Sequence, residues 1–448
     1  MFGTSGIRGR FGEEVTAGTA LAVGRAVASE GNEHVVVGRD PRETGSLLIE
    51  ALSAGLRECG ANVARLGELP TPTIARSVGW YDADMGVAVT ASHNPPADNG
   101  LKLWHPDGSA VVGDDAVAIA DRIRHGDYAF ADWDETGSRH RFGGARGRHL
   151  DAIEEAVDVD PPLHVVVDAG HGTGELTAAA LRRLGCTVTT LNGVADGSFP
   201  ARESEPTADS CRELCEIVAG GEAALGIAHD GDADRMLAVT ESGEFVPGDT
   251  LLALFARREA DPGTRVAVPI DASMAIKDEL AAVGADVTYT RVGDGYVARR
   301  AAEAGVVFGG EPSGAWIWPD ETRAPDGPLA AAKLAAMVAT DGSLDAMAAD
   351  VNTVPISRRS VECDRNEAVV ERIVEAMPED DDRVDTVDGA RVDADDGWFL
   401  IRASGTEPLV RITAEAREHD RMVALLETAE GLVEEAIETG SVERRPVD

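Results

Sequence analysis

The sequence predicts an α/β protein with three successive, similar units, each on a mixed or mainly parallel sheet, and a smaller α+β unit at the carboxyl end. Two observations support this prediction: a strand, helix and strand pattern occurs three times, and it disappears in the last quarter. Strands joined by a crossover helix pair in parallel, and such sheets are covered by helices on both faces. A chain of 448 residues is long enough for three or four such units.

The three copies of the pattern span residues 34–66, 164–191 and 265–290. In each copy a glycine closes the helix (Gly60, Gly185 and Gly284), where the left-handed conformation commonly ends a helix. The spacing between these glycines, 185 − 60 = 125 and 284 − 185 = 99 residues, sets the expected size of each unit. We therefore expect four domains, at residues 1–142, 143–242, 243–344 and 345–448.

The last expected domain lacks the repeat. An acidic loop at residues 378–382 precedes short strand-like runs, including residues 398–401, and a closing helix is expected over residues 421–437. This order of short strands and a terminal helix indicates the smaller α+β domain.

The charge balance excludes several kinds of partner. The chain has 80 acidic against 41 basic residues, a net charge of −39, spread over its whole length. This composition predicts a halophilic surface and makes nucleic acid an unsuitable partner.

No run of 18 apolar residues offers a membrane span, and the amino terminus lacks a basic and apolar leader, so we expect a cytoplasmic protein. Five cysteines without a CxxC pair indicate reduced thiols.

A reactive serine is predicted directly after the apolar run 85–89. Ser92 stands in the segment 90–96, where prolines and the following Asn-Gly fix the backbone, with His93 beside it. Lys102 follows closely and is one of only three lysines in the chain. We expect Lys102 to manage protons in preference to His93, because nearby cations should lower its pKa. The alternative is that Lys102 is a solvated loop charge.

A metal site is predicted at residues 230–235. Asp230, Asp232 and Asp234 alternate in a tight turn between two apolar runs, so their carboxylates can converge on a hard cation such as Mg²⁺. A calcium EF-hand is one alternative, because Glu241 is at the twelfth loop position. However, Arg235 is at the sixth position, where glycine is needed. A solvated Asp-Gly turn is the other alternative.

Three further loops carry groups suited to a phosphorylated sugar. Residues 402–408, followed by Arg411, combine guanidinium, hydroxyl and flexible backbone donors, as phosphate sites do. Residues 311–314 offer a carboxylate and a hydroxyl for sugar hydroxyls, and the glycine-rich segment 3–9 presents Arg8. Taken alone, each of the first two loops is also compatible with an ordinary turn, and the segment with Arg8 is compatible with a flexible chain end. Together with the serine and metal loops, they predict one central cleft to which every domain contributes.

This combination resembles the α-D-phosphohexomutase superfamily over essentially the whole chain and in the family's order. The matching segments are residues 90–95, 230–235, 310–314 and 402–408. The resemblance implies that Ser92 carries a phosphoryl group and that Mg²⁺ is bound by Asp230, Asp232, Asp234 and a phosphate oxygen on Ser92. It also implies that phosphoserine donates to a hexose phosphate, that the hexose 1,6-bisphosphate reorients, and that its other phosphate returns to Ser92.

The resemblance also distributes roles among the remaining residues. Arg8 and Lys102 neutralise charge around Ser92, and Arg235, Glu311 and Ser313 bind the sugar. The phosphate that is not reacting is held by Arg402, Ser404, Gly405, Thr406 and Arg411.

Within the superfamily, residues 3–9 and 402–408 look most like mutases that interconvert glucosamine 6-phosphate and glucosamine 1-phosphate. Ala315 departs from the many relatives with a histidine after the sugar loop. Glucose or mannose phosphates are therefore the alternative substrates, and a sugar-phosphate phosphatase and a non-catalytic sensor are alternative functions. We expect a small phosphosugar as the partner, no nucleic acid or membrane, and a monomer or homodimer.

Overall fold

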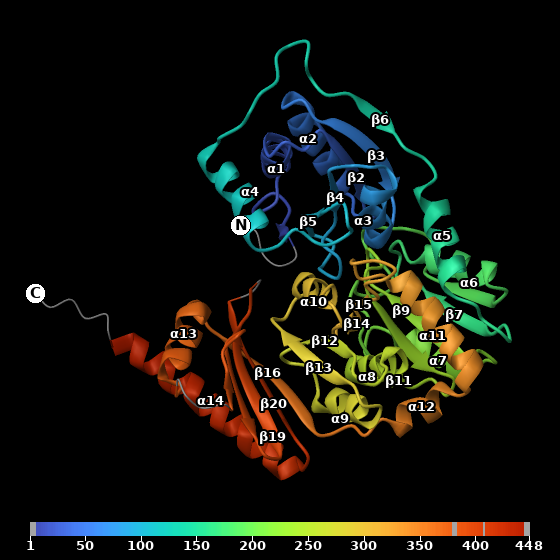
Figure 1. Cartoon of the computed structure of the whole chain (residues 1–448), viewed down its shortest axis with the longest axis vertical. Helices are drawn as coiled ribbons and strands as arrows, with labels where there is room; N and C mark the ends of the chain where they lie inside the picture. Colours follow the sequence, from blue (N-terminus) through green and yellow to red (C-terminus); the bar gives the residue numbers. More distant parts are fainter. Residues whose placement is uncertain (1–5, 379–382, 406–407, 443–448) are drawn as a thin grey trace, which may run out of the picture.

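The computed structural model describes residues 6–378, 383–405 and 408–442, and it contains four sheets that follow one another along the chain (Figure 1). The first sheet lies at one end of the molecule, and the fourth lies beside the third at the other end. None of the helices in the described part of the chain combines the length and the apolar character that a membrane span requires.

The first sheet has six strands in the order β1-β5-β4-β2-β3-β6. Its strands are β1 (Ile7–Arg10), β2 (His34–Arg39), β3 (Asn62–Glu68), β4 (Met85–Val89), β5 (Asp98–Trp104) and β6 (Arg139–Arg141). Val35 and Val37 of β2 pack with α1 (Ala17–Ser29), α2 (Gly45–Glu58) and α4 (Asp114–His125), whereas Val36 packs with α3 (Thr71–Trp80). This alternation buries β2 on both faces, as expected for the centre of a parallel sheet.

The second sheet has the order β11-β10-β9-β7-β8 and the third β13-β12-β14-β15. The elements of the second unit are α5 (Ala145–Ala156), β7 (His164–Asp168), α6 (Glu175–Arg183), β8 (Thr187–Leu191), α7 (Arg212–Ala219), β9 (Leu225–His229), β10 (Met236–Thr240) and β11 (Phe245–Val246). Those of the third are α8 (Gly248–Glu259), β12 (Arg265–Pro269), α9 (Met274–Ala282), β13 (Asp286–Thr290), α10 (Asp294–Ala301), β14 (Val306–Gly310), β15 (Trp316–Ile317), α11 (Gly327–Asp341) and α12 (Leu344–Asp350).

These three sheets share one topology. Each has a central strand (β2, β7 or β12) between two parallel neighbours, and the later neighbour in the chain pairs with an antiparallel strand (β5, β10 or β15). The prediction of three similar α/β units is confirmed. The serine loop joins β4 to β5, the metal loop joins β9 to β10 and the sugar loop joins β14 to β15, so the three chemical loops occupy the same position in three copies.

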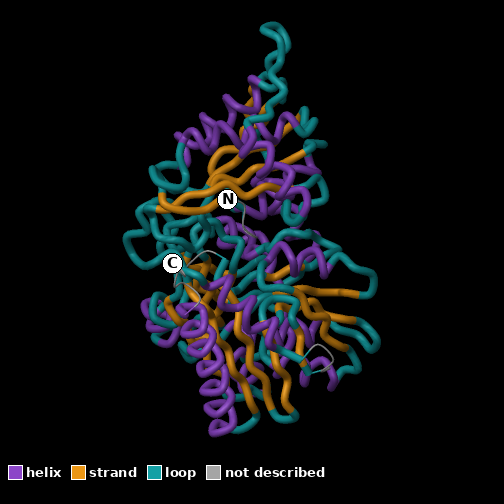
Figure 2. The backbone as a smooth tube through the Cα atoms, turned by 90° about the vertical axis from the view of Figure 1, so that its left-hand side faces the viewer, coloured by secondary structure: helices purple, strands orange, loops and turns teal. Residues whose placement is uncertain are grey.

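The fourth sheet is antiparallel throughout its described strands, in the order β16-β20-β19-β18-β17. Its elements are β16 (Ile356–Glu362), α13 (Asn366–Ala376), β17 (Val384–Asp385), β18 (Ala390–Ala394), β19 (Gly397–Ala403), β20 (Leu409–Ala416) and α14 (His419–Val442). The two helices cover one face (Figure 2). The α+β prediction is confirmed, and α14 begins two residues earlier than expected and continues to Val442.

The second and third units share one apolar core, which includes residues of α6, α8, α9 and α11 and of both sheets. The first and fourth units have separate cores. The second sheet continues to Val246 through the pairing of β11 with β10. We therefore propose that the boundary between these two units follows Val246, and not residue 242.

Candidate active site

Ser92 lies in the loop between β4 and β5 and is 2% exposed. Its backbone has a φ of +50°, a conformation that non-glycine residues rarely adopt and that often marks functional sites. The hydroxyl donates to Asp230 Oδ2 at 2.5 Å and lies 3.4 Å from Asp234 Oδ1. The loop therefore directs this hydroxyl at the metal loop of the second unit.

A buried arginine that the sequence analysis missed fixes the serine loop. Arg42 follows β2, is completely buried and is paired with Asp40 at 3.0 Å. Its guanidinium donates at 2.5–3.0 Å to the carbonyl oxygens of Ser92, Asn94, Pro95 and Asp98. Because one planar group satisfies four carbonyls, the loop backbone around Ser92 is rigid.

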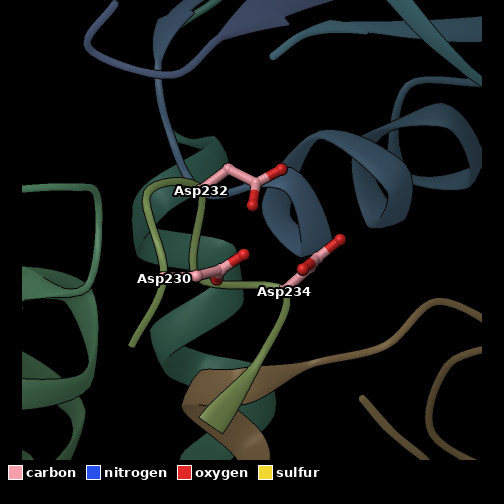
Figure 3. Close-up of side chains that lie close together, drawn as sticks. All are labelled: Asp230, Asp232 and Asp234. Atoms are coloured by element: carbon pink, nitrogen blue, oxygen red, sulfur yellow. The ribbon is translucent and has the colours of Figure 1, made fainter. Parts of the chain in front are cut away.

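The metal loop places three buried carboxylates around one point (Figure 3). Ala233, with a φ of +54°, bends the loop, and oxygens of Asp230, Asp232 and Asp234 all lie within 4.8 Å of one another. Both flanks are strands, β9 and β10, which excludes the EF-hand alternative because that motif joins two helices.

Asp232 indicates that these carboxylates fit a cation. Its Oδ2 accepts from Thr71 Oγ1 at 2.6 Å, whereas its buried Oδ1 has no hydrogen-bond partner among the described residues. A buried carboxylate oxygen left without a partner is costly unless something else binds it. Oxygen ligands of this kind suit Mg²⁺.

The electrostatics of the trio agree with this interpretation. Burial and the two neighbouring carboxylates raise the pKa of Asp230 well above its usual value. Burial and Asp232 raise the pKa of Asp234 to about 6. Like charges held this close disfavour one another's ionisation, and a bound divalent cation would remove that repulsion.

Lys102 is buried on β5, so the solvated-loop alternative is wrong. Its ammonium forms a very short hydrogen bond with Asp294 at the start of α10, lies 3.7 Å from Asp234 and stands over the Trp104 ring. Burial lowers the pKa of Lys102, but Asp294 and Asp234 raise it more, and the net shift is upward. The expectation of a lowered pKa is therefore wrong, and Lys102 is a fixed cation.

The pKa of His93 shifts in the opposite direction to that of Lys102. The charge of Arg235, then burial, then Arg8 and two further arginines strongly lower its pKa, so its ring is neutral. Its Nδ1 lies 3.5 Å from Ser92 Oγ. In the unliganded chain His93 is therefore a weak base, because the surrounding arginines disfavour its protonated form.

Arg8 is on β1, the edge strand that pairs with β5, and it reaches the same space. Its guanidinium donates to Asn94 at 3.3 Å, and its buried Nε has no partner among the described residues. The donor is therefore available to an anion beside the serine loop.

Asp294 was also missed from the sequence. It contacts Lys102 across 192 residues and comes from the third unit. The only local indication is its position after Gly293, at the start of a helix, where an acidic residue is favoured for helix stability alone.

The sugar loop is tied to the metal loop. Arg235 and Ala315 form an isolated antiparallel bridge, and Met236 N donates to Gly314 O at 2.9 Å. Glu311 accepts from Gly293 N at 2.7 Å and from Ser313 Oγ at 3.2 Å. Burial, then Asp294, raises the pKa of Glu311 to about 7.

In the fourth unit, Arg402 of β19 and Arg411 of β20 stand directly opposite each other. Arg402 lies 3.8 Å from Asp271 of the third unit. Ser404 is buried and its backbone is bonded to Leu409, whereas Gly405 is exposed. Thr406 lies outside the described residues. Arg411 contributes to the lowered pKa of His93, so this unit faces the serine loop.

Comparison with known families identifies this arrangement. The four domain profiles of the family described as phosphoglucomutase/phosphomannomutase match in order: domain I over residues 1–129, domain II over 147–243, domain III over 247–354 and the C-terminal domain over 353–430. This chain belongs to the phosphoglucomutase/phosphomannomutase family. It is accordingly an enzyme of the isomerase class, a phosphohexomutase that moves a phosphoryl group within a sugar phosphate.

Similar members of the family include curated relatives from archaea. A probable phosphoglucosamine mutase of Methanopyrus kandleri is 44% identical over 446 residues, with 98% of each chain covered. A protein of the same name from Methanothermobacter thermautotrophicus is 41% identical with the same coverage.

Solved structures agree with the fold. A phosphoglucomutase/phosphomannomutase family protein of Burkholderia thailandensis has a TM-score of 0.85 at 27% identity and covers 97% of this chain and 98% of its own. A putative phosphomannomutase of Thermus thermophilus has a TM-score of 0.79 at 27% identity, with 97% and 99% covered.

Proposed function

We propose that this phosphohexomutase interconverts glucosamine 6-phosphate and glucosamine 1-phosphate through a phosphoserine at Ser92 and a bound hexose 1,6-bisphosphate. The observation that carries the proposal is the contact between the Ser92 hydroxyl and Asp230, beside a buried oxygen of Asp232 that has no partner among the described residues. A serine directed at a carboxylate trio suits phosphoryl transfer, because that reaction needs positioning and charge neutralisation above all.

Asp230, Asp232 and Asp234 would hold Mg²⁺, together with a phosphate oxygen on Ser92. When bound, the cation would neutralise the charge of the phosphoryl group during transfer.

The surrounding residues would complete the transfer. The phosphorus–oxygen bond to Ser92 breaks while a bond to the sugar hydroxyl oxygen forms. His93 takes the hydroxyl proton, once the negative charge of the phosphoryl group offsets the arginine charges that lower its pKa in the unliganded chain. Lys102 and Arg8 bring positive charge to the transferred group, and the Arg8 Nε that lacks a partner within the described chain supports this assignment. In the second half of the reaction the same groups act in reverse, once the bisphosphate has reoriented.

The sugar would be held from two sides. Arg235, Glu311 and Ser313 contact hydroxyls, and the phosphate that is not reacting is bound by Arg402, Ser404, Gly405, Thr406 and Arg411. The positions of Arg402 and Arg411, directly opposite each other on β19 and β20, support the second assignment, because two guanidinium groups on one face of a sheet can bind one dianion together.

An amino sugar fits the charge around the sugar loop. Burial first, and then the carboxylates of Asp294 and Asp271, raise the pKa of Glu311, whereas Arg235 lowers it and Lys102 already pairs with Asp294. A substrate ammonium would favour the ionised form of Glu311, whereas the neutral hydroxyl of a glucose or mannose phosphate would not. The names of the archaeal relatives support the same substrate. Glucose and mannose phosphates are the second candidates, because Ala315 removes the histidine of many relatives.

One assay tests both the reaction and the substrate. The purified chain, supplied with Mg²⁺ and the matching 1,6-bisphosphate, is given glucosamine, glucose or mannose 6-phosphate, and the 1-phosphate and inorganic phosphate formed are both measured. We expect glucosamine 1-phosphate to form fastest without net phosphate release. Phosphate release would indicate a phosphatase, and binding without turnover a sensor.

The Ser92→Ala variant tests the phosphoserine. We expect its mutase rate to fall at least about 10⁴-fold, because a covalent route cannot proceed without the hydroxyl. Its melting temperature should stay within a few degrees of the parent's. Ser109→Ala, at an exposed turn in the same unit, serves as the matched control and should keep full activity. Normal turnover by Ser92→Ala would overturn the phosphoserine mechanism.

A further inference from the structure

A long connection between β8 and α7, residues 192–211, reaches from the second unit to the first. Its residues 197–204, which we call the bridging segment, pack against Arg42. A Cβ atom on Gly197 would lie 2.5 Å from the Cα of Arg42, and the Arg42 guanidinium stands over the Phe199 ring, 5.0 Å from its centre. Gly197 and Phe199 are both buried. The bridging segment is therefore fixed against the arginine that holds the serine loop.

The bridging segment ends at the backbone of the reacting serine. Ser204 is 3% exposed, and its hydroxyl donates to the carbonyl oxygen of Ser92 at 3.0 Å, across 112 positions. The same carbonyl oxygen accepts from Arg42 at 2.8 Å. The two lone pairs of this oxygen are thus bound by one residue of each unit. Because the carbonyl is bonded to the Cα of Ser92, fixing it restricts where the Ser92 hydroxyl can lie.

A buried ion pair anchors the bridging segment to the second sheet. Arg202 pairs with Asp168, the last residue of β7, at 2.6 Å, and neither side chain is more than 5% exposed. The Arg202 guanidinium also donates to the carbonyl oxygens of His229 at 2.6 Å and Glu203 at 2.9 Å. His229 directly precedes the metal loop, and Glu203 directly precedes Ser204. One guanidinium therefore holds Ser204 and the base of the metal loop in a fixed relation.

The bridging segment, the serine loop and the metal loop meet at Gly231. A Cβ atom at this position would lie 2.8 Å from Ser204 Oγ, 2.9 Å from Ser92 O and 3.0 Å from the Phe199 ring. Such distances leave no room for a side chain, so only glycine permits this close approach. Gly231 follows Asp230, whose carboxylate accepts from the Ser92 hydroxyl at 2.5 Å. The contact with Ser204 is therefore adjacent to the reacting groups.

We propose that Ser204 is a positioning residue for phosphoryl transfer. Its hydrogen bond to the Ser92 carbonyl sets the place of the reacting hydroxyl, which belongs to the first unit, relative to the carboxylates of the second. The inference rests on the proposed role of Ser92 as the phosphoserine. Without this bond, the remaining hydrogen bond to the Ser92 carbonyl comes from Arg42 in the first unit. A misplacement of about 1 Å can slow a reaction about 100-fold.

The Ser204→Ala variant of the full chain tests the proposal by steady-state kinetics. We expect kcat to fall about 10- to 100-fold and KM for the sugar phosphate to stay within about twofold, because Ser204 orients Ser92 and does not bind the sugar. The melting temperature should stay within a few degrees of the parent's. Ser198→Ala, at an exposed position of the same segment, is the matched control and should behave as the parent does. An unchanged kcat in Ser204→Ala, or an effect on KM alone, would overturn the proposal.

Hydrogen exchange measured by mass spectrometry gives a readout that does not depend on activity. The peptide with residues 90–96 should exchange about 2- to 10-fold faster in Ser204→Ala than in the parent or in Ser198→Ala, because one restraining hydrogen bond is lost. Equal exchange in all three proteins would refute the positioning role. A parent without mutase turnover would contradict the proposed function, and the exchange rates would still decide whether Ser204 fixes the serine loop.

Gly231→Ala disturbs the same contact from the opposite side. The added methyl group needs the space that the Ser204 hydroxyl occupies, so we expect kcat to fall at least as far as in Ser204→Ala. Because both changes break one contact, the Gly231→Ala and Ser204→Ala double variant should be scarcely slower than Gly231→Ala alone. If the two losses multiply in full, Ser204 acts at some other point and the proposal is wrong.

Discussion

Lys102 and Asp294 are the clearest case in which one contact decides what a residue can do. The ammonium is buried between Asp294 of the third unit and Asp234 of the second, and its charge is held beside Ser92. The sequence predicted that Lys102 is special but gave it the wrong electrostatic character, because carboxylates 132 and 192 positions away are not visible in a local pattern.

Asp294→Asn should lower kcat about 10- to 100-fold with little change in KM, because Lys102 keeps only the more distant Asp234 and moves from its working position. Steady-state kinetics measure this split. If Asp294 acts through Lys102, the Asp294→Asn change should have little further effect once Lys102 is replaced. The double variant should therefore be scarcely slower than Lys102→Met alone. Additive losses would show that Asp294 acts independently of Lys102.

Glu311 gives a prediction on pH. Its pKa rises from an ordinary 4.5 to about 7 in the folded chain, so burial favours the neutral form. Between pH 4.5 and 7 the unfolded chain ionises this group and the folded chain does not, so the folded state loses stability as pH rises. Glu311→Gln should therefore be more stable than the parent by up to about 3 kcal/mol above pH 7 and by little at pH 4.5.

Urea unfolding at several pH values measures this difference. Glu222→Gln, at an exposed position, is the control and should show no such trend. A difference between Glu311→Gln and the parent that stays constant from pH 4.5 to 8 would contradict the assignment.

At the scale of elements, the notable feature is that each of the three similar sheets places its loop after the third parallel strand. The strands, the helices and the repeat were predictable, because hydrophobic periodicity and helix-ending glycines are local properties. The serine and metal loops, which the contact of Ser92 with Asp230 brings together, were predictable from their residue types. The hydrogen bonds that hold these loops in place were not predictable, because they join residues far apart in the sequence. Arg42 is 50 positions from Ser92, and Thr71 is 161 positions from Asp232. The loop at residues 126–138, where Trp133 is 89% exposed, had no periodic pattern at all.

Arg42 is the element-level prediction. Arg42→Ala should lower the free energy of unfolding by about 3–5 kcal/mol, because it removes the ion-pair partner of the buried Asp40 carboxylate and the donor to four carbonyls. Arg42→Lys retains the charge but reaches fewer carbonyls, so it should recover part of the stability and little of the kcat. Chemical denaturation and kinetics measure the two effects. Full activity in Arg42→Lys would show that the rigid loop is not required.

For the whole molecule, the net charge of −39 dominates the response to salt. Repulsion between acidic side chains reaches about 10 Å at 0.1 M salt and about 3 Å at 1 M. We therefore expect the melting temperature to rise steadily as KCl is raised from about 0.1 M to about 1 M. Scanning calorimetry or dye-based melting measures it. A flat or falling curve would refute the halophilic interpretation of the composition.

The common core of the second and third units has a consequence for synthesis on the ribosome. The second unit leaves the exit tunnel before the third. Its helix α6 carries apolar residues that pack against α11, and α11 begins 144 residues after α6 ends (327 − 183). Until that helix emerges, the nascent chain exposes an unburied apolar surface, and the middle of the protein completes its folding only after translation has passed the third sheet.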